Sequence, residues 1–175
     1  MSQIRIRNVV PVTVQATRGY GEWVMVKVQT DQGIEGIGEG FTWRGEANAV
    51  RNHIVSIGQE LVGGDPLAIE SFVDRFLPIA DGREACAAVS ALEIALWDIL
   101  GQVAELPVCA LLGGQRRQAI PLYADHGVFD GADDWGERVE RIVAAKEAGF
   151  EMFKWDPFEG RGTPDPCELA SQIAR

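Results

Sequence analysis

The chain has 175 residues, of which 46% are hydrophobic and 24% charged, and its formal net charge at pH 7 is −10. This length and composition are typical of a globular protein with a hydrophobic core, and they exclude a disordered chain. The negative charge argues against a nucleic-acid partner, which would require a basic surface. An anionic ligand would need cationic side chains or a metal ion at its binding site to overcome the negative electrostatic field of the whole protein.

The cysteines and the apolar segments indicate the compartment. Three widely spaced cysteines without a C-x-x-C pair, together with only two histidines, do not suit a zinc site. We interpret the cysteines as reduced thiols and expect a cytoplasmic protein. The sequence has no run of eighteen apolar residues and no signal-like start, so we expect neither export nor membrane insertion.

Alternating apolar and polar residues predict three antiparallel strands, at 4–14, 22–30 and 34–40. One face of the first strand is predicted to carry Ile4, Ile6, Val10, Val12 and Val14. The glycines of "GIGEGFTW" (36–43) lack the third glycine of a dinucleotide-binding loop, and we assign them to a tight turn.

Three helices are predicted after the strands. Apolar residues recur at spacings of three and four over 46–61, and Asp65 is placed to cap a second helix that begins at Pro66. The third helix has the longest apolar stripe and ends before Pro107. Residues 1 to about 112 are therefore predicted to form an α+β unit.

The pattern then changes to alternating strands and helices. We predict a strand at 120–125, a helix at 133–148, a strand at 152–156 and a further helix that begins at Cys167. This order is typical of a parallel α/β arrangement.

Three polar residues stand at or beyond the ends of these two strands. Lys154 and Asp156 are two positions apart in "FKWDPF", so both point to one face of the second strand. His126 directly follows the first strand, where parallel α/β folds collect ligand contacts. The alternatives are a surface ion pair for Lys154 and Asp156 and a structural loop histidine for His126.

Two loops of the α+β unit combine glycine with aromatic and basic residues. The loop at 16–23 carries Tyr20 and Trp23, and the loop at 41–46 carries Trp43 and Arg44. Each is either a plain connection or a lid that contacts substrate. His53, within the first helix, is interpreted as a solvated or locally paired side chain.

The third helix and its continuation carry a family resemblance. The segment "AAVSALEIALWDILGQVAELPVCALLGG" (87–114) resembles the N-terminal signature of the mandelate racemase and muconate-lactonizing branch of the enolase superfamily. The positions that match are Ala87, Ser90, Ala91, Leu92, Glu93, Ala95, Leu96, Asp98, Gly101, Gln102, Pro107, Leu111, Leu112 and Gly113.

The resemblance implies an α+β capping domain at 1–115, followed at 116–175 by the first βα units of a (β/α)₇β TIM-type barrel. It also implies an enzyme that removes the proton beside a carboxylate, with Mg²⁺ stabilising the resulting enolate. The metal ligands of the family lie on later barrel strands, so the resemblance assigns none to this chain. Because a complete barrel takes about 250 residues, it implies the leading part of a chain about twice as long.

The family's second barrel strand carries a Lys-x-Lys pair, and here Lys154 matches the first lysine whereas Asp156 replaces the second. The second lysine, when desolvated and neutral, acts as a proton-abstracting base, and an aspartate cannot replace it in this role. The resemblance therefore favours a histidine–aspartate pair on later strands as the base. The form K-x-D-P-F is similar to relatives that dehydrate sugar acids. A racemase or cycloisomerase of the same superfamily is the alternative.

By position, Tyr20 and Trp23 match one substrate-closing loop of the capping domain, and Trp43 and Arg44 match the other. The resemblance therefore implies that they contact a small carboxylate such as a sugar acid, with Arg44 meeting a distal carboxylate or hydroxyl. We also expect a homo-oligomer. The alternative of another class is an inactive capping module that binds a partner.

Overall fold

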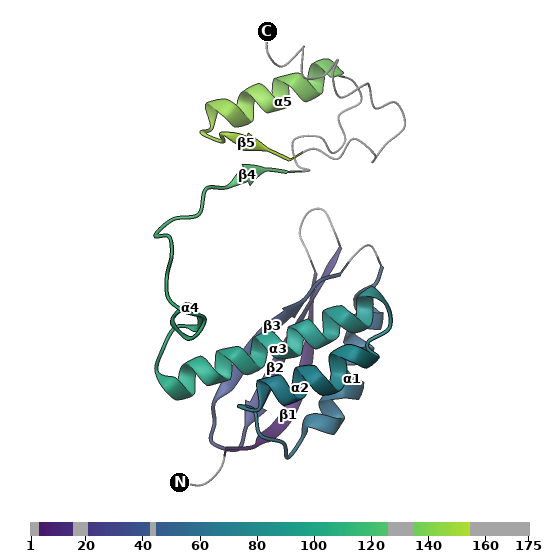
Figure 1. Cartoon of the computed structure of the whole chain (residues 1–175). Helices are drawn as coiled ribbons and strands as arrows, with labels where there is room; N and C mark the ends of the chain where they lie inside the picture. The colour runs from purple at the N-terminus through teal and green to yellow at the C-terminus, as the bar shows by residue number, and fades with distance from the viewer. Residues whose placement is uncertain (1–3, 16–20, 43–44, 126–134, 155–175) are drawn as a thin grey trace. The chain divides into compact units, whose positions relative to one another are not determined.

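The computed structural model describes residues 4–15, 21–42, 45–125 and 135–154 (Figure 1). The chain divides into two compact units, residues 1–115 and residues 116–175, and each is described by itself.

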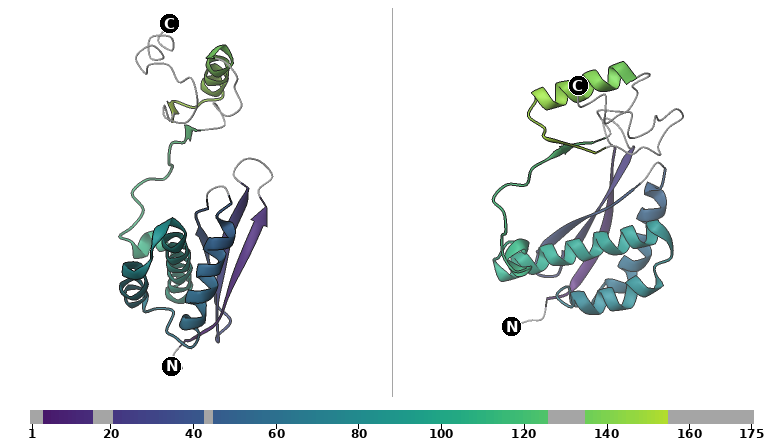
Figure 2. Two further views of the ribbon diagram at one scale, coloured as in Figure 1. Left: turned by 90° about the vertical axis from the view of Figure 1, so that its right-hand side faces the viewer. Right: turned by 45° about the horizontal axis from the view of Figure 1, so that its top comes forward.

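The first unit begins with the predicted three-stranded meander. The strands β1 (Ile6–Gln15), β2 (Glu22–Thr30) and β3 (Glu35–Gly40) pair antiparallel in the order β1-β2-β3. Five helices follow: α1 (Ala47–Leu61), α2 (Ile69–Phe76), the short 3₁₀ helix η1 (Leu77–Ile79), α3 (Gly82–Ala104) and α4 (Val108–Leu111). Helices α1 and α3 pack on one face of the sheet, so this unit has two layers (Figure 2).

The core lies between these layers. Alternate residues of β2 point toward the helices and are fully buried, as the period of two predicts. The largest fully buried apolar side chains of the core are Val24, Val26 and Val28 from β2, Val50 and Ile54 from α1, and Leu92, Leu96 and Ile99 from α3.

A β-bulge in β1 reverses the face of most of its residues. Ile6 pairs with Thr30 and Asn8 with the next residue, Gln29, so one residue of β1 has no partner in the ladder. Val9 therefore packs on the core, whereas Val12 and Val14 are 36% and 49% exposed. The prediction that these valines share a face with Ile6 is wrong, because one extra residue shifts every later side chain to the other face.

The second helix begins later than predicted. Asp65 Oδ1 accepts a hydrogen bond from the Leu67 N–H at 2.9 Å, and α2 starts at Ile69. Asp65 thus stabilises a turn that includes Pro66 and does not cap the helix itself.

The glycines of β3 have a different role from the predicted tight turn. A Cβ atom on Gly38 would lie 1.9 Å from the backbone oxygen of Ala91, and one on Gly36 would lie 2.0 Å from that of Ala95. Since no side chain fits there, glycine at these positions lets the backbone of α3 lie directly against β3.

Helix α3 also covers the free edge of β3. The Ile37 N–H donates to Asp98 Oδ2 at 2.9 Å, and Gln102 Nε2 donates to the Glu35 carbonyl oxygen at 2.6 Å. These bonds satisfy backbone groups that an edge strand would otherwise present to another chain.

The length and hydropathy of α3 are sufficient for a membrane span, and it is the single helix of the described residues for which this is so. Half of its apolar window is buried in the structure, where the helix packs on the sheet. Its composition therefore reflects a core helix.

The second unit contains the predicted strand, helix and strand. These are β4 (Tyr123–Ala124), α5 (Trp135–Glu147) and β5 (Met152–Phe153), and the two strands pair in parallel. A small cluster of Ala124 and Ile142, with Ala145, Phe150 and Phe153 packed against it, joins the helix to the strands. The helix predicted from Cys167 lies outside the described residues.

We predict that Gly38→Ala lowers the free energy of unfolding by about 3 kcal/mol, because its methyl group would overlap a backbone oxygen that cannot move aside. Gly40→Ala is the matched control in the same strand. Its Cβ would meet the Val50 side chain at 3.0 Å and the Ala87 oxygen at 3.3 Å, so the loss should be about 1 kcal/mol. Urea unfolding measures both, and equal losses would contradict the close backbone approach.

We predict that Asp98→Ala accelerates hydrogen exchange of the Ile37 amide and lowers stability by about 1 kcal/mol, because the edge N–H loses its acceptor. Ser90→Ala, an exposed position of the same helix, should leave exchange at Ile37 unchanged. Hydrogen exchange followed by NMR measures both variants, and an unaffected Ile37 amide in Asp98→Ala would argue against this role for α3.

Candidate functional site

The ends of the two parallel strands bring a carboxylate and an ammonium group together. Asp125 directly follows β4 and Lys154 directly follows β5. The Lys154 N–H donates to the Ala124 carbonyl oxygen at 2.8 Å, so the hydrogen bonding between the strands continues to this point. Because parallel strands end at the same edge of a sheet, both side chains lie where ligands bind in α/β folds.

The two side chains form an ion pair. Lys154 Nζ donates to Asp125 Oδ2 at 3.1 Å, and the side chains are 51% and 36% exposed, respectively. Each charge favours the ionised form of the other group. Water screens a pair this exposed, so its contribution to stability is about 1 kcal/mol or less.

The structure describes two of the predicted site residues. Lys154 is in the ion pair above, and Trp23 lies on β2 opposite Val14, on the sheet face that points away from the core, with 51% of its surface exposed. The other predicted site residues lie outside the described residues, namely Tyr20, Trp43, Arg44, His126 and Asp156.

Asp125 was not predicted from the sequence, although a signal for it was present. In "YAD" and "MFK" the third residue follows a two-residue parallel strand, so Asp125 and Lys154 occupy equivalent positions on neighbouring strands. The predicted strands, 120–125 and 152–156, extend beyond these residues, so the sequence did not fix the register that places Asp125 beside Lys154.

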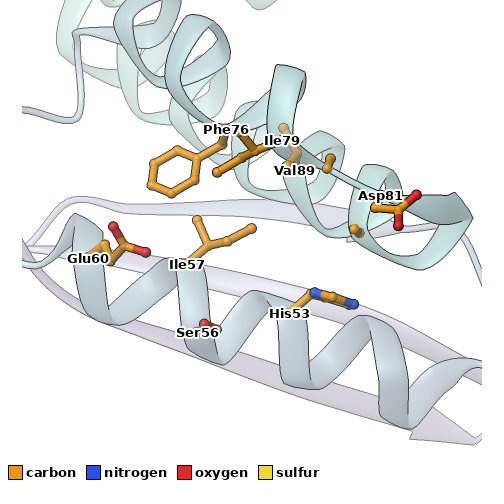
Figure 3. A pocket seen from close by; sticks show the side chains of 10 residues that line it. His53, Ser56, Ile57, Glu60, Phe76, Ile79, Asp81 and Val89 are labelled. Atoms are coloured by element: carbon orange, nitrogen blue, oxygen red, sulfur yellow. The ribbon is translucent and has the colours of Figure 1, made fainter.

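A pocket of about 240 Å³ in the first unit lies between α1, the η1 segment and the start of α3 (Figure 3). Ile57 points from α1 toward Phe76 and Ile79 across an apolar centre. Glu60, at one end, is paired with Arg75, and His53, at the other, is exposed as predicted. None of the predicted substrate-binding residues lines this pocket.

The described residues do not fit a metal ion. No group of three or more His, Cys, Asp or Glu side chains with the spacing of a metal site occurs in the described part of the chain. The ion pair supplies one carboxylate, and its neighbouring ammonium competes electrostatically with a cation.

The sheet and helices of the first unit match a family model. Residues 3–113 correspond to the mandelate racemase / muconate lactonizing enzyme, N-terminal domain. The chain belongs to this family. Its membership of the enolase superfamily, predicted from residues 87–114, and its α+β capping-domain fold, predicted from the strand and helix patterns, are thus confirmed.

Curated relatives of this family member include dehydratases. The D-xylonate dehydratase of Haloferax volcanii is 28% identical over 158 residues, which are 87% of this chain and 37% of the relative. A D-galactonate dehydratase family member from Musicola paradisiaca is 34% identical over 183 aligned positions, covering 100% of this chain and 42% of the relative.

A solved structure also matches. The crystal structure of an enolase from Pantoea ananatis with bound D-gluconate and magnesium has a TM-score of 0.71 and 31% identity, covering 86% of this chain and 36% of that one. The chain thus spans 36–42% of the length of these relatives.

We predict that Lys154→Met changes the free energy of unfolding by less than about 1 kcal/mol, because the pair is screened by water. Lys146→Met, in the last turn of α5, is the control for removing a lysine from the same unit. Urea unfolding checks both variants. A loss several times larger for Lys154→Met would show that the pair holds the strands together.

Proposed function

We propose that this chain is the leading part of an acid-sugar dehydratase. The observation that carries the proposal is the Lys154–Asp125 pair at the ends of two parallel strands in a member of this family. Two relatives are named for dehydration of a sugar acid or for a family of such enzymes, and a matched structure holds D-gluconate. A polyhydroxy carboxylate suits a site that offers an ammonium and a carboxylate together.

Dehydration of such an acid breaks the C–H bond of the carbon beside the carboxylate and the C–O bond of the hydroxyl on the adjacent carbon. The hydroxyl leaves as water after it takes up a proton, and the resulting enol tautomerises to a 2-keto acid. The proton beside a carboxylate is very weakly acidic, so its removal requires cations directed at the developing negative charge. Lys154 is suited to orient the substrate or to assist this acid–base chemistry.

We assign the remaining substrate contacts by position in the family. Tyr20, Trp43 and Arg44 are assigned to the loops that close over the substrate, Trp23 lies on β2 next to the first of these loops, and His126 follows β4 in the sequence. Asp156 is proposed to hydrogen-bond substrate or Lys154. The protein is further proposed to be a cytoplasmic homo-oligomer.

Mg²⁺ is the cofactor that we propose for the complete enzyme, and a matched structure contains it. When bound, it supplies stabilisation of the negative charge on the substrate carboxylate. The described residues form no metal site, and from the family resemblance we propose that its ligands lie on later barrel strands, beyond residue 175.

The assay uses the protein expressed from the reading frame that contains this sequence, with Mg²⁺ and a panel that includes xylonate, galactonate and gluconate. We expect at least one sugar acid to give a 2-keto product, measured as its semicarbazone. Lys154→Ala should lower turnover by about 100-fold or more, because an electrostatic contact to the reacting group is lost.

Lys146→Ala is the control, since this residue lies on α5 and outside the ion pair. Racemisation of a 2-hydroxy acid without dehydration of any sugar acid would replace the dehydratase with the racemase alternative. Near-normal turnover of Lys154→Ala would remove Lys154 from the site.

A further inference from the structure

We propose that the outer face of the sheet in the first unit binds a second copy of this chain, about a two-fold axis beside Met25. The outer face consists of the strand residues that point away from α1 and α3, the helices that cover the opposite face (Figure 2). The inference rests on the homo-oligomer proposed above, for which it names the contact, and it does not depend on the dehydratase activity.

The outer face carries an apolar patch. An antiparallel sheet with one covered side commonly presents polar residues on its other side. Here Val14, Trp23 and Ile37 are each about half exposed. Val12 pairs with Met25 and Val14 with Trp23, so the patch is continuous across β1 and β2. A continuous apolar surface of this kind marks an interaction site.

The edges of the sheet do not suit a partner that adds a strand. Helix α3 covers the edge of β3, because Ile37 donates to Asp98 and the Glu35 carbonyl oxygen accepts from Gln102. On β1, Pro11 lacks the N–H that strand pairing requires. A partner is therefore expected to pack on the face of the sheet and not at its edge.

The pattern of side chains on β2 is suited to a copy of itself. Trp23 and Lys27 lie two positions before and after Met25, and all three point to the outer face. Two sheets packed face to face keep their strands within about 30° of each other. A two-fold axis that lies between the sheets and crosses the strands at Met25 therefore places Lys27 of each copy over Trp23 of the other.

The contacts that this axis creates are complementary. A lysine ammonium over a tryptophan ring forms a cation–π pair. Glu39 pairs with Met25 across the sheet, so it lies within reach of Lys27 of the second copy. On β1, the same axis brings Val10 of one copy over Val14 of the other. Since the chain has a net charge of −10, two copies associate best through a face on which the charges are balanced in this way.

The oligomeric state tests the contact. The protein expressed from the reading frame that contains this sequence is measured by sedimentation velocity over a range of concentrations. We expect Met25→Asp to raise the dissociation constant of the two-fold contact by about 100-fold or more, because a residue at the axis meets its own copy and two like charges are buried. Met25→Arg should have the same effect. An equimolar mixture of the two variants should restore the assembly, since the two introduced charges are then opposite.

Thr13→Asp is the matched control. Thr13 pairs with Val24, so it points to the other face of the same strand, and it is exposed. This substitution should leave the mass of the assembly unchanged. Far-UV circular dichroism checks that every variant is folded.

A second set of variants tests the direction of the axis without a change at Met25. Trp23→Lys should weaken the assembly, because the introduced lysine faces Lys27 of the second copy. Addition of Lys27→Glu to this variant should restore it, because two opposite charges then face each other. This set decides the proposal if the Met25 variants do not fold.

Three results would overturn the proposal. A monomeric unmodified protein would remove both the homo-oligomer and its contact. An assembly that withstands Met25→Asp would remove the contact alone. Loss of the assembly without recovery in the mixture would show that this face meets a different surface. Dehydration of sugar acids is assayed separately, so its failure would remove the proposed activity and leave the contact.

Discussion

The close contact between the backbones of α3 and β3 joins the helical layer of the first unit to its sheet. Glycine occupies each position of β3 that faces the helix, and the helix presents Ala87, Ala91 and Ala95 to it. With no side chains between them, the two elements approach more closely than a usual helix and sheet. Asp98 and Gln102 then complete the contact through hydrogen bonds to the strand edge.

The residues that reveal the family are therefore those of a packing contact. Ala91, Ala95, Asp98 and Gln102 belong to the segment from which the resemblance was drawn, and each contacts or faces β3 in the structure. This segment identifies the fold with high specificity and carries no information on the reaction. Chemistry must be read from the strand ends, where Lys154 and Asp125 lie.

Periodicity in the sequence was sufficient for the element order and for the buried face of β2, since side-chain alternation follows directly from strand geometry. It could not place the β-bulge after Ile6, because a single unpaired residue leaves no mark in the pattern. The glycines of β3 were wrongly assigned to a turn. The backbone that requires glycine at these positions belongs to α3, which is distant in sequence, so no local pattern reveals it. The Lys154–Asp125 pair likewise depends on which strands are adjacent, which no local pattern states.

The glycines of β3 also have a consequence for the order of folding. Glycine loses more conformational entropy than any other residue on becoming ordered, so β3 has little intrinsic tendency to form a strand. What stabilises it is α3, and the bond between Ile37 and Asp98 spans 61 positions of the chain. The third strand should consequently join the hairpin only after the helix has formed. Nucleation of this unit would then depend on a long-range encounter, which slows folding relative to a locally connected meander.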